Sequence, residues 1–199
     1  MLKPQPATPL IIRLETLHHI VRTVERADAT ERWGKWFLDP TAARHLNLRP
    51  FEMSLDRLRG YIDGFDRVTS HLLGVFDKET GMIVAIRSIY VDFARREFLD
   101  NILVGEVEAR GKYARAESTD AILPYFFEEL DLESSRCTVL GENKKMLELV
   151  ARKGWVHEGS ELRPSVVGGA PIEVRRYRLD RDTWRQKMRE RAAHAVPTT

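Results

Sequence analysis

Residues 102–112 read Ile-Leu-Val-Gly-Glu-Val-Glu-Ala-Arg-Gly-Lys. This stretch is the most informative part of the sequence about the fold. Its first half is apolar and contains β-branched residues, which is typical of a strand. From Glu108 the chain turns polar, and the apolar residues that follow recur at helical spacing. The pattern predicts a strand over 98–107, a polar loop around Arg110, and a helix over 115–130.

The chain before this stretch predicts extended structure, then helices, then a hairpin. Residues 10–24 are apolar and β-branched, and the aromatic residues of 27–39 recur at helical spacing until Pro40 ends that helix. Ser54 is a suitable N-cap for the next helix. A hairpin is expected from a strand over 71–76, a Gly-containing turn over 78–81 and a second strand over 82–91.

The chain after this stretch predicts a second half in which helices connect strands. A strand over 136–140 precedes a helix that begins at Asn143 and ends at Gly154. Two further strands follow, over 155–162 and 172–179. Helical crossovers appear only in this half, so we expect an α/β (α+β) domain whose sheet is mostly antiparallel.

The same pattern predicts how the chain is divided. Residues 1–9 contain three prolines and are expected to form a loose tail. Residues 10–184 are expected to form one domain. Residues 185–199 are assigned to a basic terminal helix and a frayed end.

The composition excludes several classes of protein. The 199 residues are 43% hydrophobic and 31% charged, which excludes extensive disorder. Thirty-two basic against 30 acidic residues give a net charge of +2, so we expect no nucleic-acid partner. No apolar run approaches the ~20 residues of a membrane span, and the start of the chain lacks a signal-peptide core, so we expect no membrane partner. The single cysteine, Cys137, excludes an internal disulfide and favours a cytoplasmic location.

Three segments together resemble the GNAT superfamily of acyl-CoA-dependent N-acetyltransferases. They are the strand and Arg-Gly-Lys loop of 102–112, the Glu142-Asn143 helix that ends in Lys153-Gly154-Trp155, and the hairpin that leads to Trp184. The ending is most similar to the branch that acetylates ribosomal-protein N-termini. The resemblance covers roughly residues 14–184 and rests on the order and spacing of the segments.

The resemblance implies a fold and a cosubstrate site. It implies a sheet splayed between the strands 98–107 and 136–140, with helices on both faces and acetyl-CoA in the splay. Its cofactor-binding residues on the strand would be Val104, Gly105 and Val107. Those of the phosphate loop would be Arg110, Gly111, Lys112, Tyr113, Ala114 and Arg115, and Asn143 would contribute from the start of the helix after strand 136–140.

The chain departs from the family pattern at two places. The family's phosphate-loop glycines fall on Tyr113 and Arg115, or else one residue is missing between Lys112 and Tyr113. The tyrosine that many members use as general acid falls on Val150. We therefore expect three cations, Arg110, Lys112 and Arg115, to replace lost amide contacts to phosphate.

Glu106 is the candidate catalytic residue, because it is expected at the end of the cofactor strand. A partly buried carboxylate with a raised pKa could take a proton from the acceptor amine. The alternative is a surface glutamate, or one paired with a nearby arginine. Four further polar residues border the expected acceptor side, of which strand alternation would turn about half toward it: Tyr90, Asp92, Asp100 and Asn101.

The expected function is acetyl transfer from acetyl-CoA to a primary amine, by direct attack on the thioester. The acceptor would be a small-molecule amine or a protein N-terminus. The alternative is a GNAT-fold protein that binds acyl-CoA but is catalytically weak or inactive, which the two departures favour. The histidines show no metal-ligand spacing, so we expect no metal. The resemblance implies a homodimer that pairs through the long hairpin 155–179.

Overall fold

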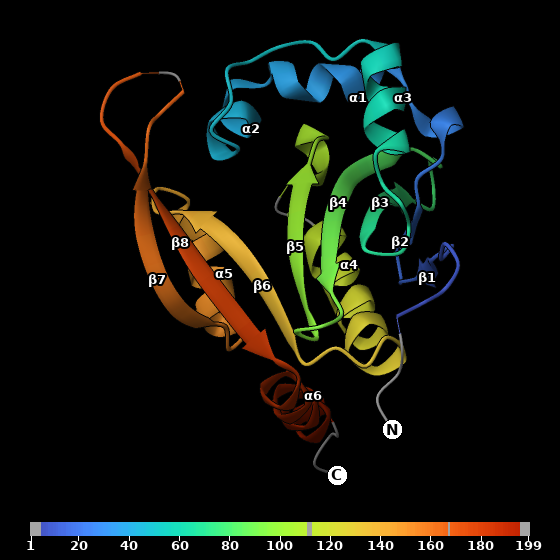
Figure 1. Ribbon diagram of the computed structural model, residues 1–199, viewed down its shortest axis with the longest axis vertical. Helices are drawn as coiled ribbons and strands as arrows, with labels where there is room; N and C mark the ends of the chain where they lie inside the picture. Colours follow the sequence, from blue (N-terminus) through green and yellow to red (C-terminus); the bar gives the residue numbers. More distant parts are fainter. Residues whose placement is uncertain (1–4, 111–112, 167, 196–199) are drawn as a thin grey trace.

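The computed structural model describes residues 5–110, 113–166 and 168–195. They form one eight-stranded sheet in the order β1-β2-β3-β4-β5-β6-β8-β7 (Figure 1). The strands are β1 (Arg13–Glu15), β2 (His19–Thr23), β3 (Ser70–Asp77), β4 (Ile83–Asp92), β5 (Glu97–Val104), β6 (Ser134–Leu140), β7 (Val156–Arg163) and β8 (Ile172–Asp180). The helices are α1 (Glu31–Gly34), α2 (Pro40–His45), α3 (Leu55–Asp63), α4 (Tyr113–Pro124), α5 (Lys144–Arg152) and α6 (Arg181–Ala195).

The sheet opens between β5 and β6. Every other neighbouring pair of strands is antiparallel, whereas β5 and β6 are parallel and pair only from Glu97–Leu99 to Ser134–Arg136. Beyond these residues the two strands diverge, and Figure 1 shows the separation widening toward the ends of both arrows. The expected splay in a mostly antiparallel sheet is therefore confirmed.

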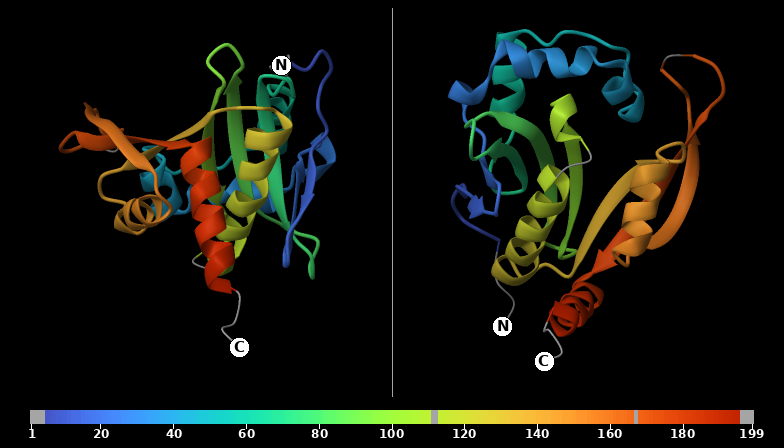
Figure 2. Two further views of the ribbon diagram at one scale, coloured as in Figure 1. Left: turned by 90° about the horizontal axis from the view of Figure 1, so that it is seen from below. Right: turned by 180° about the vertical axis from the view of Figure 1, so that it is seen from behind.

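Helices cover both faces of the sheet, as expected (Figure 2). Helix α4 packs on one face of β1–β5, where Ile122 and Phe126 are fully buried in the larger core cluster. The opposite face is covered by the segment of α1 to α3, where Trp33 and Leu58 are fully buried. Helix α5 packs on β6 and β8 through Val150, against Cys137.

Two boundaries on the cleft side differ from the expected ones. Strand β5 ends at Val104 instead of 107, because the N–H groups of Gly105 and Glu106 both donate to the Val84 carbonyl and the ladder cannot continue. Pro40 follows the end of the 3₁₀ helix Lys35–Leu38, as expected, and it also begins a further helix, α2, because a proline at the first helical position loses no hydrogen bond. Asp39 caps α2 by accepting from the N–H groups of Thr41 and Ala42.

The helices behind the sheet also differ at their ends. Helix α4 ends at Pro124 and continues as a π-helical turn, Tyr125–Glu129. Helix α6 begins at Arg181, four residues before the expected 185, and the Trp184 ring lies 5.3 Å from that of Phe127. Within the described residues, no helix is both long and apolar enough to cross a lipid bilayer.

Candidate active site

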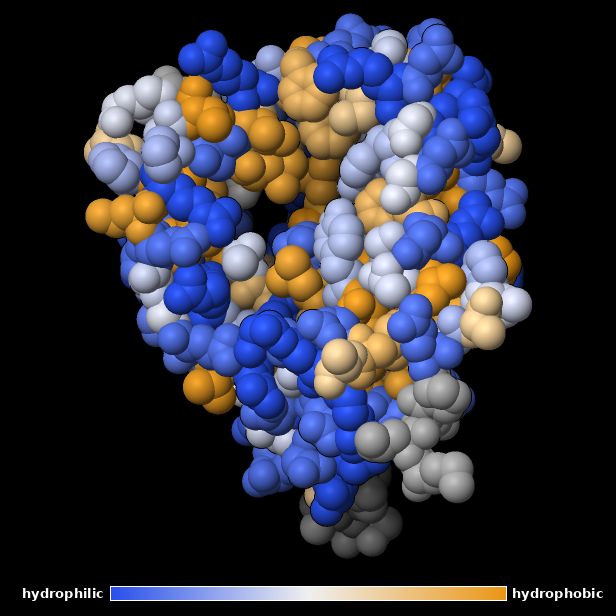
Figure 3. Space-filling model, in the orientation of Figure 1, coloured by the Kyte–Doolittle hydropathy of each residue, from blue (hydrophilic) through white to orange (hydrophobic). Residues whose placement is uncertain are grey.

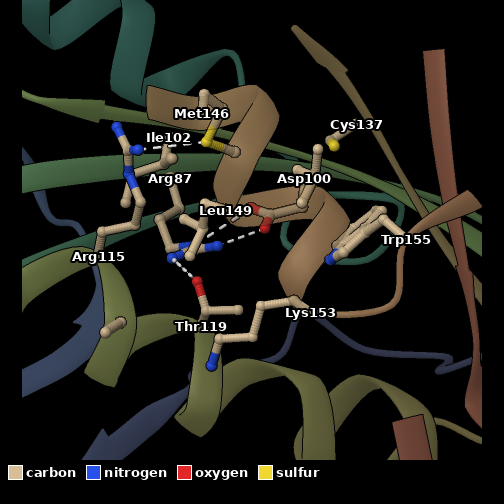
Figure 4. A pocket seen from close by; sticks show the side chains of 12 residues that line it. Arg87, Asp100, Ile102, Arg115, Thr119, Cys137, Met146, Leu149, Lys153 and Trp155 are labelled. Carbon is tan, nitrogen blue, oxygen red and sulfur yellow. Dashed lines mark hydrogen bonds and ion pairs between the residues drawn. The ribbon is translucent and has the colours of Figure 1, made fainter. Parts of the chain in front are cut away.

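A small cavity of about 50 Å³ lies where β5 and β6 diverge, enclosed by α4 and α5 (Figure 4). Ile102 and Cys137 line it from the two strands, and Arg115 and Met146 from the two helices. The cavity wall therefore carries both charged and apolar groups.

A buried ion pair forms the floor of this cavity. The Arg87 guanidinium on β4 contacts both carboxylate oxygens of Asp100 on β5, and it donates to Ser118 Oγ at 2.7 Å and Thr119 Oγ1 at 3.2 Å on α4. The ion pair therefore locks β4, β5 and α4 together. Asp100 consequently faces α4, so it is one of the residues that strand alternation turns away from the acceptor side.

The opposite face of the same strands carries the other expected acceptor-side residues. Tyr90 stacks obliquely on Phe65 of the segment after α3, with ring centroids 6.0 Å apart. Asn101 lies opposite Ser88, on the same face of the sheet as Tyr90. Asp92 is on that face by the same alternation and accepts from the Arg95 N–H. This is the side that α1 to α3 cover.

Arg110 closes the end of β5. Its Nε donates to the Val104 carbonyl and its Nη2 to the Gly105 carbonyl, each at 3.1 Å, and its Nη1 pairs with Asp39. Since backbone groups alternate along a strand, the Val104 carbonyl points away from β4 and toward the splay. In this state Arg110 is turned into the protein rather than outward from the loop.

Glu106 is held by two residues of the α1 region. Its carboxylate accepts from Arg32 Nε at 2.7 Å, Arg32 Nη2 at 2.5 Å and Trp36 Nε1 at 2.8 Å. The Arg32 hydrogen bonds, aided by Trp36, outweigh burial and lower the pKa of Glu106. The raised pKa expected for a general base is therefore wrong, and Glu106 is a paired carboxylate.

Trp36 also explains why a glycine precedes Glu106. A Cβ on Gly105 would lie 1.8 Å from Trp36 Cδ2, far inside van der Waals contact. The indole thus covers the Gly105 backbone while its N–H fixes Glu106. Trp36, Gly105 and Glu106 are thus packed together at the end of β5.

The remaining predicted loop residues have different surroundings. Tyr113 is exposed and its ring stacks on that of His18 at 4.7 Å, whereas Ala114 is buried in the core beneath α4. The exposed Val107 lies on a 3₁₀ turn. Gly111 and Lys112 lie outside the described residues.

Arg115 reaches across the splay from α4 to α5. Its Nη1 lies 3.2 Å from Met146 Sδ (Figure 4), and burial together with the nearby Arg87 lowers its pKa. Asn143 begins α5 and accepts from the Met146 N–H at 3.2 Å, so it is an N-cap. Arg115 and Met146 therefore line the cavity from the two helices, and Asn143 caps the helix that carries Met146.

An open pocket of about 320 Å³ lies at the end of β5, on the side of α1. Its lining combines Arg32, Lys35 and Trp36 with Asp39 and the segment 105–108. Figure 3 shows a hollow in the surface below α2 and between the two halves of the sheet, with hydrophobic side chains on its upper rim. A ligand could therefore reach the splay through this pocket, on the side of the sheet where α1 to α3 lie.

Sequence reasoning missed the partners that define this end of β5. Arg32 and Trp36 are more than 60 residues from Glu106 in the chain, and Asp39 is 71 residues from Arg110. The Asp39-Pro40 pair was a local signal for a helix start, but nothing in it indicated Arg110. Among the residues in the described ranges, no cluster of three or more His, Cys, Asp or Glu suitable for a metal ion is found.

No protein-family model matches the chain, and no curated protein matches it by sequence. Solved structures do match. An acetyltransferase of the GNAT family from Bacillus anthracis is 15% identical, with a TM-score of 0.71 over 86% of this chain and 99% of that one. A spermidine N-acetyltransferase from Vibrio cholerae, in complex with CoA and spermine, is 20% identical, with a TM-score of 0.71 over 85% and 99%.

A third match is a ribosomal-protein-S5-alanine acetyltransferase from Vibrio fischeri, 16% identical, with a TM-score of 0.72 over 87% of this chain and 98% of that one. All three coverages span nearly the whole of the matched chains. The chain therefore has the GNAT fold, in the arrangement that the splayed sheet already indicated.

Proposed function

We propose that the protein is an acetyl-CoA-dependent N-acetyltransferase that acts on a primary amine. The observation that carries the proposal is the parallel β5–β6 pair, which opens after three residues beside the first turn of α4. Strand edges in such a gap have free backbone groups that can pair with an extended amide-containing arm. The same fold in the Vibrio cholerae enzyme was solved with CoA and spermine.

We assign the cosubstrate to the splay and to the start of α4. The backbone of Val104, Gly105 and Val107 would face the arm, with Asn143 opposite. The segment from Arg110 to Arg115 would hold the phosphates, where a helix N-terminus favours an anion. Only the Arg110 Nε would have to give up its acceptor, the Val104 carbonyl, to the arm; its other two nitrogens can keep Asp39 and the Gly105 carbonyl.

The reaction would be a direct transfer. The neutral amine nitrogen attacks the thioester carbonyl carbon, the C–S bond breaks, and the thiolate takes up a proton. Orientation of the two substrates in the splay would supply most of the rate. With its lowered pKa, Glu106 is better suited to hold the strand end than to abstract the amine proton, so we assign proton removal to water.

A second candidate function is an acyl-CoA-binding protein with weak or no transfer activity. The specific observation in its favour is Arg110, which caps both the Val104 and Gly105 carbonyls. Val150 supports it, since an alkyl side chain that packs on Cys137 cannot donate a proton.

Calorimetric titration with acetyl-CoA, followed by an amine screen with thiol detection, separates the two candidates. The screen should contain a polyamine, an amino sugar and peptides with free N-termini. Binding with thiol release supports the enzyme, and binding without release supports the second candidate. No binding at millimolar acetyl-CoA would contradict both.

We further propose a cytoplasmic homodimer without nucleic-acid or membrane partners. The lone Cys137 is buried and unpaired, as in reducing compartments. The exposed edge strand β7 offers a surface for a second copy.

A further inference from the structure

The width of the splay is not fixed by the sheet itself. Only three residue pairs join β5 to β6, so the two strands are free of each other over the rest of their lengths. Something else must hold their far ends at a constant separation. The segment Asp39–Arg49, which contains α2 and is here called the strut, spans that opening in Figure 1.

One end of the strut is tied to β5. The Asp39 carboxylate uses Oδ1 to cap α2, with the Thr41 N–H at 2.7 Å, and uses Oδ2 to pair with Arg110. Arg110 in turn holds the carbonyls of Val104 and Gly105. This end is partly buried: the side chains of Arg110 and Asp39 are 27% and 22% exposed, so water screens the pair only in part.

The other end of the strut is tied to the half of the sheet beyond β6. The Asn47 side chain donates to the Pro164 carbonyl at 3.1 Å and accepts from the Val166 N–H at 3.0 Å. Arg49 Nε donates to the Val166 carbonyl at 2.9 Å, and Arg44 Nε pairs with Glu142 at 2.8 Å. These contacts reach the β7–β8 loop and the turn before α5.

We propose that Asp39 and Asn47 are positioning residues that set the width of the splay through this strut. They act on the β5–β6 opening through Arg110 at one end and through the β7–β8 loop at the other. The strut would keep the opening at a width that admits the arm of the cosubstrate. The inference rests on the proposed function for its consequence in catalysis, but its structural part stands without it.

Conservative variants separate the strut from simple helix capping. Asp39→Asn keeps a good N-cap for α2 and removes the charge that pairs with Arg110. Asn47→Gly removes the amide but suits the φ of 53° at that position. The matched control is Asp56→Asn, an exposed aspartate in the first turn of α3 that pairs with Arg59.

Steady-state kinetics on the wild type, the control, both single variants and their double should show one pattern. Each single variant should raise the KM for acetyl-CoA roughly fivefold to tenfold, which corresponds to one lost ordinary hydrogen bond. It should change kcat less than about twofold. The KM of the double variant should be no higher than the higher of the two single-variant values, because a strut that is released at one end no longer fixes the separation of the strands. Multiplied effects in the double, or a wild-type KM for Asp39→Asn, would overturn the proposal.

Hydrogen exchange without any cosubstrate gives a second readout, independent of activity. Both single variants should speed amide exchange of 102–104 and 138–140, which border the splay, and leave the β3–β4 ladder unchanged. Unchanged exchange in both would overturn the strut even if KM rises. If the wild type binds no acetyl-CoA, the proposed function fails, while faster exchange at the splay would still support the strut.

Discussion

Gly105 is the described glycine at which an added Cβ would come closest to a neighbouring atom. Gly105→Ala would place a methyl group 1.8 Å from the Trp36 ring, so either the indole or the strand end must move. We expect a loss of about 1–3 kcal/mol in the free energy of unfolding, the range for an overpacked core. Urea denaturation measures it. Gly60→Ala is the control, because its Cβ would meet nothing within 4 Å and an alanine there should stabilise α3.

Glu106 provides a second test at the same scale. The pKa of Glu106 is lowered in the folded protein, so its ionised carboxylate stabilises the fold above the unfolded pKa of about 4.3. This stabilisation is lost as the pH falls through the pKa of Glu106 in the folded protein. Glu106→Gln should therefore cost roughly 1.5–3 kcal/mol at pH 7, and this cost should shrink as the pH falls below the unfolded pKa.

The same variant also tests the role of Glu106 in turnover. If water removes the amine proton, the pH profile of kcat/KM for Glu106→Gln should keep the shape of the wild-type profile. Loss of the acidic limb in the variant would instead restore Glu106 as the general base.

At the scale of elements, the Arg87–Asp100 pair joins two strands to a helix. Both side chains are buried, so removing one partner leaves an uncompensated charge. Arg87→Met should cost about 3–5 kcal/mol, and the double variant Arg87→Met with Asp100→Leu should recover a large part of it. Chemical denaturation with two probes checks both values. Arg59→Met breaks an exposed pair and should change stability by less than about 0.5 kcal/mol.

Glu117 ties the β1–β2 turn to α4. Its carboxylate accepts from Thr16 Oγ1 and the His18 N–H and lies 2.9 Å from His19 Nδ1. Burial opposes its ionisation, but these hydrogen bonds outweigh burial and hold its pKa at about 2. The resulting stability is present above the unfolded pKa of about 4.3 and is lost as the pH falls toward 2.

Glu117→Gln should therefore flatten the acid side of the stability curve. We expect a loss of about 1–3 kcal/mol at pH 7 and a smaller difference from the wild type at pH 3. Thermal unfolding followed by circular dichroism between pH 3 and 7 measures it. An equal loss at both ends of that range would show that Glu117 acts through packing instead of charge.

At the scale of the whole molecule, the two edges of the sheet differ. Strand β1 has three residues, whereas β7 has eight and exposes Val156 and Leu162 by 59% and 72%. A long exposed edge with apolar side chains is a site for pairing with another chain. Light scattering at micromolar concentration should therefore give twice the mass of one chain.

A charge at the β7 edge should abolish that pairing. Leu162→Lys should halve the measured mass and leave the circular dichroism spectrum unchanged. Leu17→Lys, on the exposed turn between β1 and β2, is the matched control and should leave the mass as it is. A wild type with the mass of a single chain would exclude the dimer.

Local patterns were enough to predict most elements of the fold. Ser54 and Asn143 are N-caps in the structure, and Gly154 follows α5 with a φ of 84°. The strand, loop and helix around 102–130 occur in the predicted order. These features follow from periodicity and from side chains that bond to their own neighbours, which a linear sequence contains in full.

The chemical state of the site could not be predicted in this way. Whether Glu106 has a raised or a lowered pKa depends on Arg32, which lies 74 residues away in the chain. Arg110 turns inward because Asp39 and two strand carbonyls meet it there, and Asp100 faces α4 because Arg87 does. A side chain's charge and direction depend on neighbours that folding brings together, and no local pattern records them.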